Sequence, residues 1–192
     1  MSPLARRLAL AGLASTLALS ALGARELSRV GVNQGYQPAQ PIAFSHRLHA
    51  GEAQVPCLYC HFAATRSRHA GIPPSGVCMN CHALLTNQTE ELRKLKDAVE
   101  QKRPLAWTKV HNLPDFVYFN HSQHLAASLA CQECHGAVEK MVEVAQVAPL
   151  TMGWCLDCHR RRRVGTPTTV AMAGHLQADA PLGGLDCGKC HY

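Results

Sequence analysis

The sequence predicts loops and short helices wrapped around covalently attached cofactors, with one hydrophobic helix at the N-terminus. Three observations support this fold class. The 192 residues include ten cysteines, and all of them fall in five short motifs of one form. Aromatic residues make up only 5% of the chain, which is few for a core built from side chains alone. Glycine and proline interrupt the chain repeatedly, which favours loops and short helices.

Composition excludes several other classes of protein. The net charge of +6 is moderate, and no long basic tract is interleaved with aromatic residues. These features argue against a dedicated nucleic-acid-binding protein. The composition is also unlike that of disordered, collagenous or coiled-coil proteins.

Every cysteine pair reads C-x-x-C-H, the motif that attaches a c-type haem. Two thiols one helical turn apart add to the two vinyl groups of a porphyrin, and the following imidazole binds the iron as its proximal ligand. The sequence therefore predicts a multihaem cytochrome c with five c-type haems. The attaching cysteines are Cys57 and Cys60, Cys78 and Cys81, Cys131 and Cys134, Cys155 and Cys158, and Cys187 and Cys190. The proximal ligands are His61, His82, His135, His159 and His191.

Three other readings of the cysteines compete with haem. Disulfide bonds fit an even count in an exported chain, but they need no histidine after the second cysteine. Zinc fits the C-x2-C-x17-C-x2-C and C-x2-C-x20-C-x2-C spacings of motifs 1–2 and 3–4. A thioredoxin-like redox motif would not occur five times without a βαβ pattern. Histidine is about 6% of the chain, so a histidine after all five pairs by chance is roughly a one-in-a-million event, which favours haem.

Residues 1–25 are predicted to form a membrane anchor or a signal segment. Arg6 and Arg7 precede an uncharged run from Leu8 to Ala24, which as a helix is roughly 25 Å long, against about 30 Å for a hydrocarbon core. Small residues near its end could support cleavage. Either reading leaves the arginines in the cytoplasm and the rest of the chain on the periplasmic face of the inner membrane.

The chain contains an internal duplication. The pattern F-x-H-x-x-H followed by two C-x-x-C-H motifs begins at Phe44 and again at Phe119. A tandem repeat of this kind sets the organisation of the chain. We expect a first two-haem unit over residues 40–84, a linker with one helix over 85–114, a second two-haem unit over 115–160, and a tail over 161–192 that carries the fifth haem.

The linker holds the one segment with a convincing helical pattern. Residues 90–103 place apolar side chains on one face, Asn87 or Thr89 can cap the start, and Pro104 stops the helix. The aromatic-rich segment 107–119 is expected to be extended and to lie against haem faces.

The duplicated histidines are candidates for the distal iron ligands. His46 and His49 are three residues apart, as are His121 and His124, so on a helical turn each pair would be neighbours. Two neighbouring imidazoles could each bind the iron of a different haem. The alternative is a pair of surface histidines on a short helix.

The sixth ligand of the fifth haem stays open between His111, Met152, His175, Met172 and His69. A thioether ligand would give a higher reduction potential than a second imidazole. His69 could instead pair with a haem propionate.

Four segments of the chain resemble those of a known family. They are Phe44-Ser45-His46 through Cys60-His61, Arg68-His69-Ala70-Gly71-Ile72-Pro73 before Cys78, Val110-His111-Asn112-Leu113-Pro114-Asp115 running into 118–124, and Met152-Gly153-Trp154-Cys155. Over roughly residues 35–192 the chain resembles the pentahaem cytochrome c subunit of alternative complex III. Its repeated unit is also similar to those of class III and trihaem c7 cytochromes.

The resemblance implies a membrane-bound quinol-oxidising module of the respiratory chain. The implied partners are an iron–sulfur subunit related to molybdopterin enzymes, quinol-binding membrane subunits and a monohaem cytochrome c. Electrons would pass on to a soluble carrier or to a terminal oxidase.

Together these features predict a non-catalytic electron-transfer subunit. One alternative is a free or anchored periplasmic electron shuttle of the c3/c7 type. Another is a multihaem reductase acting on nitrite, sulfite or hydroxylamine, which would need an iron with an open position. All five motifs end in histidine, and enough distal ligands remain to close every iron, so a reductase is disfavoured.

Overall fold

The structure is a computed structural model, and it describes residues 2–86, 89–163 and 184–191. The chain divides into two compact units, Met1–Asn33 and Gln34–Tyr192.

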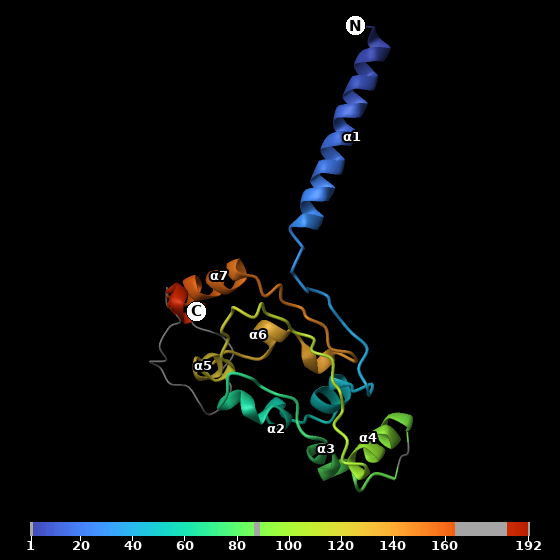
Figure 1. Ribbon diagram of the computed structural model, residues 1–192, viewed down its shortest axis with the longest axis vertical. Coiled ribbons are helices and arrows are strands. Elements are labelled where there is room, and N and C mark those ends of the chain that lie inside the picture. The colour runs from blue at the N-terminus through green and yellow to red at the C-terminus, as the bar shows by residue number, and fades with distance from the viewer. Residues whose placement is uncertain (1, 87–88, 164–183, 192) are drawn as a thin grey trace. The chain divides into compact units, whose positions relative to one another are not determined.

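The first unit is dominated by helix α1, Pro3–Leu27, shown in blue in Figure 1. The Ser2 hydroxyl accepts a hydrogen bond from the Ala5 amide at 3.2 Å, and Pro3 occupies the first helical position, so the start is well capped. The helix is longer than the uncharged run alone and spans about 38 Å. It is long and apolar enough to cross a membrane, a property that signal sequences share.

The second unit consists of short helices joined by loops. Its elements are the π-helical turn η1 (Arg47–Glu52), α2 (Cys57–Cys60), η2 (Phe62–Thr65), α3 (Ser75–His82), α4 (Glu90–Glu100), α5 (His121–Ala126), α6 (Gln132–His135), η3 (Val138–Lys140), α7 (Met152–Arg163) and η4 (Cys187–Lys189). Among the described residues the one β-type pairing is an isolated antiparallel bridge between Val117 and His191. The prediction of loops and short helices is confirmed.

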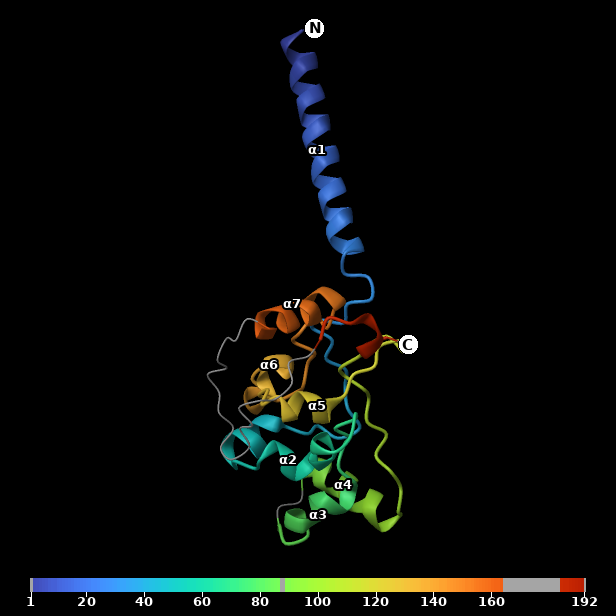
Figure 2. The same ribbon diagram turned by 90° about the vertical axis from the view of Figure 1, so that its left-hand side faces the viewer.

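The helices of the second unit are arranged from one end of the unit to the other. In both Figure 1 and Figure 2, α7 and the C-terminal segment lie at one end and α3 and α4 at the other. Helices α2, α5 and α6 lie between these ends.

Side chains alone enclose very little space in this unit. The buried hydrophobic residues of the described chain are Ile42, Ala64, Leu95, Ala98, Ala130 and Ala148. Four of these are alanines, so the apolar area that side chains bury is small, as the low aromatic content predicts. Other apolar groups would have to supply the rest of a core.

Helix α4 begins as predicted and ends earlier. The Thr89 hydroxyl accepts a hydrogen bond from the Leu92 amide at 3.3 Å, which makes Thr89 the cap; Asn87 lies outside the described residues. The helix ends at Glu100 instead of residue 103, because Lys102 adopts a left-handed conformation with φ of 53°. Thus the chain turns before Pro104 is reached.

The two repeats pack directly against each other. Gly51 of η1 lies so close to the Glu139 carbonyl of η3 that a side chain could not fit there. The Arg47 amide donates to the Met141 carbonyl at 2.9 Å beside this contact. The buried Gln146 connects the second repeat to the linker, because its side-chain oxygen accepts a hydrogen bond from the Asn112 amide at 3.1 Å. This bond fixes the chain next to His111.

Candidate haem sites

We number the five C-x-x-C-H motifs as sites 1 to 5 in chain order. At each site, one helical turn separates the first cysteine from the histidine. The histidine amide donates to the carbonyl of the first cysteine at 2.9 Å for Cys57, 3.0 Å for Cys131 and 2.9 Å for Cys187, and sites 2 and 4 lie within α3 and α7. This turn brings the two thiols and the imidazole to one side of the chain, as haem attachment requires.

The ten thiols are all free, with no disulfide among them. Burial raises the pKa of Cys134 to about 11, and the nearby Cys158 thiol adds to the effect. Burial also raises the pKa of Cys60, Cys78 and Cys155. These thiols are therefore protonated at neutral pH and lie in partly apolar surroundings. Within the described ranges, no group of three or more His, Cys, Asp or Glu side chains is placed to hold a metal ion.

The structure places each histidine of the two F-x-H-x-x-H segments opposite a histidine of one of sites 1 to 4. The ring centres are 6.4 Å apart for His46 and His61, 5.9 Å for His49 and His82, 6.4 Å for His121 and His135, and 6.2 Å for His124 and His159. Thus two histidines on one turn face two different sites.

These separations fit an iron held between each pair. An imidazole nitrogen binds a metal ion at about 2 Å, and the ring centre lies about 1.2 Å beyond it, so two imidazoles on one iron have centres about 6.4 Å apart. The observed range of 5.9–6.4 Å matches that value. A direct ring contact would be shorter, so the pairs leave a layer of space between them.

The two repeats also share the angles between these rings. The first pair of each repeat is nearly parallel, at 6° for His46 with His61 and 9° for His121 with His135. The second pair is tilted by 55° in both repeats. The duplication seen in the sequence is therefore a duplication of site geometry.

Hydrogen bonds select the tautomer that binds a metal through Nε2. When Nδ1–H donates to a carbonyl, Nε2 keeps a free lone pair. Six candidate ligands have this arrangement: His61 to Gly71, His49 to Ser45, His121 to Arg68 and His124 to Asn120, all at 2.8 Å, His159 to Gly184 at 3.2 Å, and His191 to Phe116 at 3.3 Å.

Two other candidates are kept neutral by burial. The Nδ1 atoms of His46 and His82 are buried without a hydrogen-bond partner. Burial, reinforced by His61, lowers the pKa of His46 to about 4, and burial also lowers the pKa of His82. A neutral imidazole is the form that binds iron, so both rings suit that role.

The phenylalanine of each F-x-H-x-x-H segment holds both of its histidines. Phe44 meets His46 edge to face at 4.8 Å and stacks on His49 at 4.3 Å. Phe119 repeats this arrangement at 4.8 Å and 4.4 Å with its own two histidines. The sequence pattern contained these phenylalanines, but their role as shared ring supports was not predicted.

His111 lies beside His135, the proximal-ligand candidate of site 3. Its Nε2 is 3.1 Å from Nδ1 of His135, and the ring centres are 4.3 Å apart at 78°. Burial, with His111 as the next contributor, lowers the pKa of His135 to about 4. If Nε2 of His135 faces an iron, its Nδ1 carries the proton. Nδ1–H then donates a hydrogen bond to Nε2 of His111. No sequence pattern predicted this contact, which joins residues 24 positions apart.

Site 5 is joined to the segment that leads into α5. The Tyr118 amide donates to the Cys190 carbonyl at 2.7 Å, and Val117 forms the bridge with His191. The ring next to His191 is Phe116, with centres 5.8 Å apart.

The candidates for the sixth ligand at site 5 lie in different places. Met152 is the first residue of α7 and is 60% exposed, so its side chain is free to move. His69 is exposed, and His111 is engaged as described above. Met172 and His175 lie outside the described residues.

Comparison with known proteins agrees with this geometry. Residues 95–192, just over half of the chain, match a sequence family described as the class III cytochrome c family. The multihaem cytochrome c subunit of a menaquinone reductase from Nitratidesulfovibrio vulgaris is 32% identical over 105 residues. That alignment covers 54% of this chain and 49% of the relative, so the chain spans about half of the relative's length.

Proposed function

This chain belongs to the class III cytochrome c family, and on that basis we propose that it is the five-haem electron-transfer subunit of a membrane quinol oxidoreductase. Within that class we assign it to the alternative complex III type. When bound, each haem supplies an iron that takes up and releases one electron. The chain's residues attach the haems, close their iron positions and hold the ligands neutral.

The single observation that carries this proposal is the set of four imidazole pairs. Each pair spans the distance that one iron needs, and each offers an imidazole on both sides. Two protein ligands leave no position for a substrate, so sites 1 to 4 suit electron transfer and not catalysis. The ligand assignments of His46, His49, His121 and His124 follow from the same pairing.

At site 5 we propose Met152 as the sixth ligand. Cys190 contributes to the raised pKa of the Cys155 thiol, after burial, so the two thiols are neighbours. Met152 lies one turn before Cys155 on α7, and its exposed side chain would reach from there toward the haem that Cys190 attaches at site 5. His111 is less suited, since its Nε2 already meets His135. A thioether here would give site 5 the highest potential of the five.

The membrane assignment rests on α1 and on the relative. Helix α1 is long and apolar enough to anchor the chain, which would place the haem-bearing unit on the periplasmic face. The relative is a subunit of a menaquinone reductase, so a quinone-linked complex is the assembly we propose. The partners would be an iron–sulfur subunit, quinol-binding membrane subunits and a monohaem cytochrome c, with a soluble carrier or terminal oxidase as acceptor.

Fractionation followed by quinol reduction tests this function. The full chain should stay with membranes after a high-salt wash, leave them with detergent, and copurify with other subunits. Adding menaquinol to that complex should reduce its haems. A haem protein that salt alone releases, and that purifies without partners, would instead be a periplasmic shuttle of the c3/c7 type.

A further inference from the structure

We propose that the chain arranges its five haem sites in one unbranched row, in the order 2–1–3–4–5, with sites 2 and 5 as its two ends. This inference rests on the proposed electron-transfer function. It predicts that electrons enter and leave at site 2 and at site 5, which are not the first and last sites of the sequence. The sites in the row are identified by contacts between the chain's own residues.

The histidines that face sites 2 and 1 lie on one turn, which His46 begins and η1 continues. His49 faces His82 of site 2, while His46, three residues earlier, faces His61 of site 1. The motifs themselves also touch, because the Asn80 side-chain amide of site 2 donates to the Tyr59 hydroxyl of site 1 at 2.9 Å.

Sites 1 and 3 are joined across the repeat boundary. The Arg68 carbonyl, seven residues after His61, accepts hydrogen bonds from both the backbone amide and Nδ1 of His121, at 3.2 and 2.8 Å. After burial, Cys57 is the next contributor to the raised pKa of the Cys131 thiol, so these two thiols of sites 1 and 3 are neighbours. Among the described residues, these contacts join the repeats from site 1 to site 3.

Sites 3, 4 and 5 continue the row. Helix α5 presents His121 to site 3 and His124 to site 4, in the way that η1 serves sites 1 and 2. Nδ1 of His159 at site 4 donates to the carbonyl of Gly184, three residues before the first cysteine of site 5, at 3.2 Å. The adjacent Cys155 and Cys190 thiols connect the same two sites.

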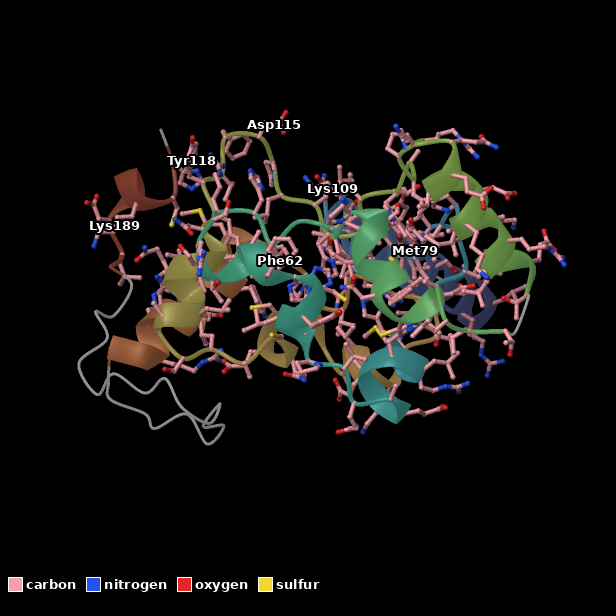
Figure 3. All side chains as sticks on the ribbon, turned by 90° about the horizontal axis from the view of Figure 1, so that it is seen from below. Phe62, Met79, Lys109, Asp115, Tyr118 and Lys189 are labelled. Atoms are coloured by element: carbon pink, nitrogen blue, oxygen red, sulfur yellow. The ribbon has the colours of Figure 1, made fainter. Side chains whose placement is uncertain are left out.

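The figures agree with this order. Along the unit, α3 of site 2 lies at one end, α2 and then α6 follow, and α7 with the C-terminal segment lies at the other end (Figures 1 and 2). Figure 3 shows Met79 of site 2 and Lys189 of site 5 on opposite sides of the unit, with Phe62, next to His61 of site 1, between them. Electron tunnelling weakens steeply with distance, so electrons would move between neighbours in this row.

A pair of ligand variants tests the order while all five haems are kept. His49→Met would mark site 2 and His46→Met would mark site 1, because a thioether ligand raises the potential and gives a distinct near-infrared band. A photosensitiser attached at Asp115→Cys injects electrons near site 5. Asp115 is exposed and, in Figure 3, lies on the same side as Tyr118. The native cysteines carry thioether bonds in the mature protein, so the new thiol is the one that is labelled.

The row predicts that the marker band of the site 1 variant changes earlier after a flash than that of the site 2 variant. Site 2 is one step further from the label than site 1. The reverse order, or equal arrival, would overturn the proposal. The photosensitiser replaces the natural donor, so the result does not depend on the quinol-linked partners and separates this inference from the proposed function.

Removing site 1 gives a second readout that needs no electron injection. In Cys57→Ala/Cys60→Ala protein the row would be cut, leaving site 2 without a neighbour. Its ferric paramagnetic resonance signal should then lose the broadening caused by coupling to another haem. The matched control Cys187→Ala/Cys190→Ala removes an end of the row and should leave the site 2 signal unchanged. Broadening of the site 2 signal that survives the loss of site 1 would contradict the order.

Discussion

Replacing His111 by alanine is expected to raise the midpoint potential of the haem at site 3 by about 40 mV, with every haem still low spin. The contact responsible is the 3.1 Å separation between Nε2 of His111 and Nδ1 of His135. An iron-bound imidazole is a stronger donor when the iron is ferric, because the extra positive charge makes its N–H more acidic. The acceptor on His111 therefore stabilises the ferric state, and removing it favours the ferrous state.

The size of the shift follows from the value of one hydrogen bond. A neutral hydrogen bond contributes about 1 kcal/mol net, and we take the ferric–ferrous difference to be of that order. For a one-electron couple, about 1.4 kcal/mol corresponds to about 59 mV, so 1 kcal/mol gives about 40 mV. The direction is upward, since the bond that is lost favoured the oxidised form.

Spectroelectrochemical titration of the purified full-length protein measures this shift. One of the five one-electron steps should move upward and the other four should stay in place. His111→Gln is the matched control, because its amide oxygen can accept the same hydrogen bond and should return most of the original potential. The reasoning fails if His111→Ala produces a high-spin haem, which would make His111 an iron ligand, or if no potential moves.

The remaining predictions concern the haem count, the ligands and their support. A pyridine haemochrome assay and haem staining after denaturing electrophoresis should give five covalent haems per chain; three or fewer, or stoichiometric zinc, would contradict the motif reading. His121→Ala and His124→Ala should each convert a different haem to high spin in paramagnetic resonance spectra, because the two rings face different sites; loss at one common haem would refute that pairing. Met152→His should lower the highest midpoint potential while all five haems stay low spin; an unchanged potential would exclude Met152 as a ligand. Phe119→Leu should change the anisotropy of two low-spin signals together, because this ring supports both histidines, whereas a change in one signal alone would argue against shared support.

The sequence was informative where spacing along the chain is enough to define a contact. The three-residue separation of His46 and His49 predicted that they would share a turn, and the structure turns them toward two different sites. The local pattern in the same way offered Asn87 or Thr89 as the cap of α4, and one hydrogen bond identifies Thr89.

Contacts that depend on the path of the backbone could not be predicted. The carbonyl of Arg68 supports His121 although no property of an arginine side chain predicts that role. The contact between His111 and His135 joins residues far apart in sequence, and it depends on how Gln146 fixes the adjoining chain. In both cases the deciding group is a main-chain atom or a partner far away in sequence.

The pairing within each repeat has a consequence for how such chains can grow. His46, which precedes η1, and His49 within it face the two sites that follow them in the first repeat, and both histidines of α5 face the two sites of the second. Under the proposed ligand assignment, a unit of this kind would supply all of its own iron ligands. A gene duplication could therefore add or remove one unit without leaving an imidazole of the other unpaired, and only the boundary contact from Arg68 to His121 would have to be made anew. The tail site has no F-x-H-x-x-H segment of its own, so its sixth ligand lies outside this repeated pattern, and the proposed Met152 would come from the second unit.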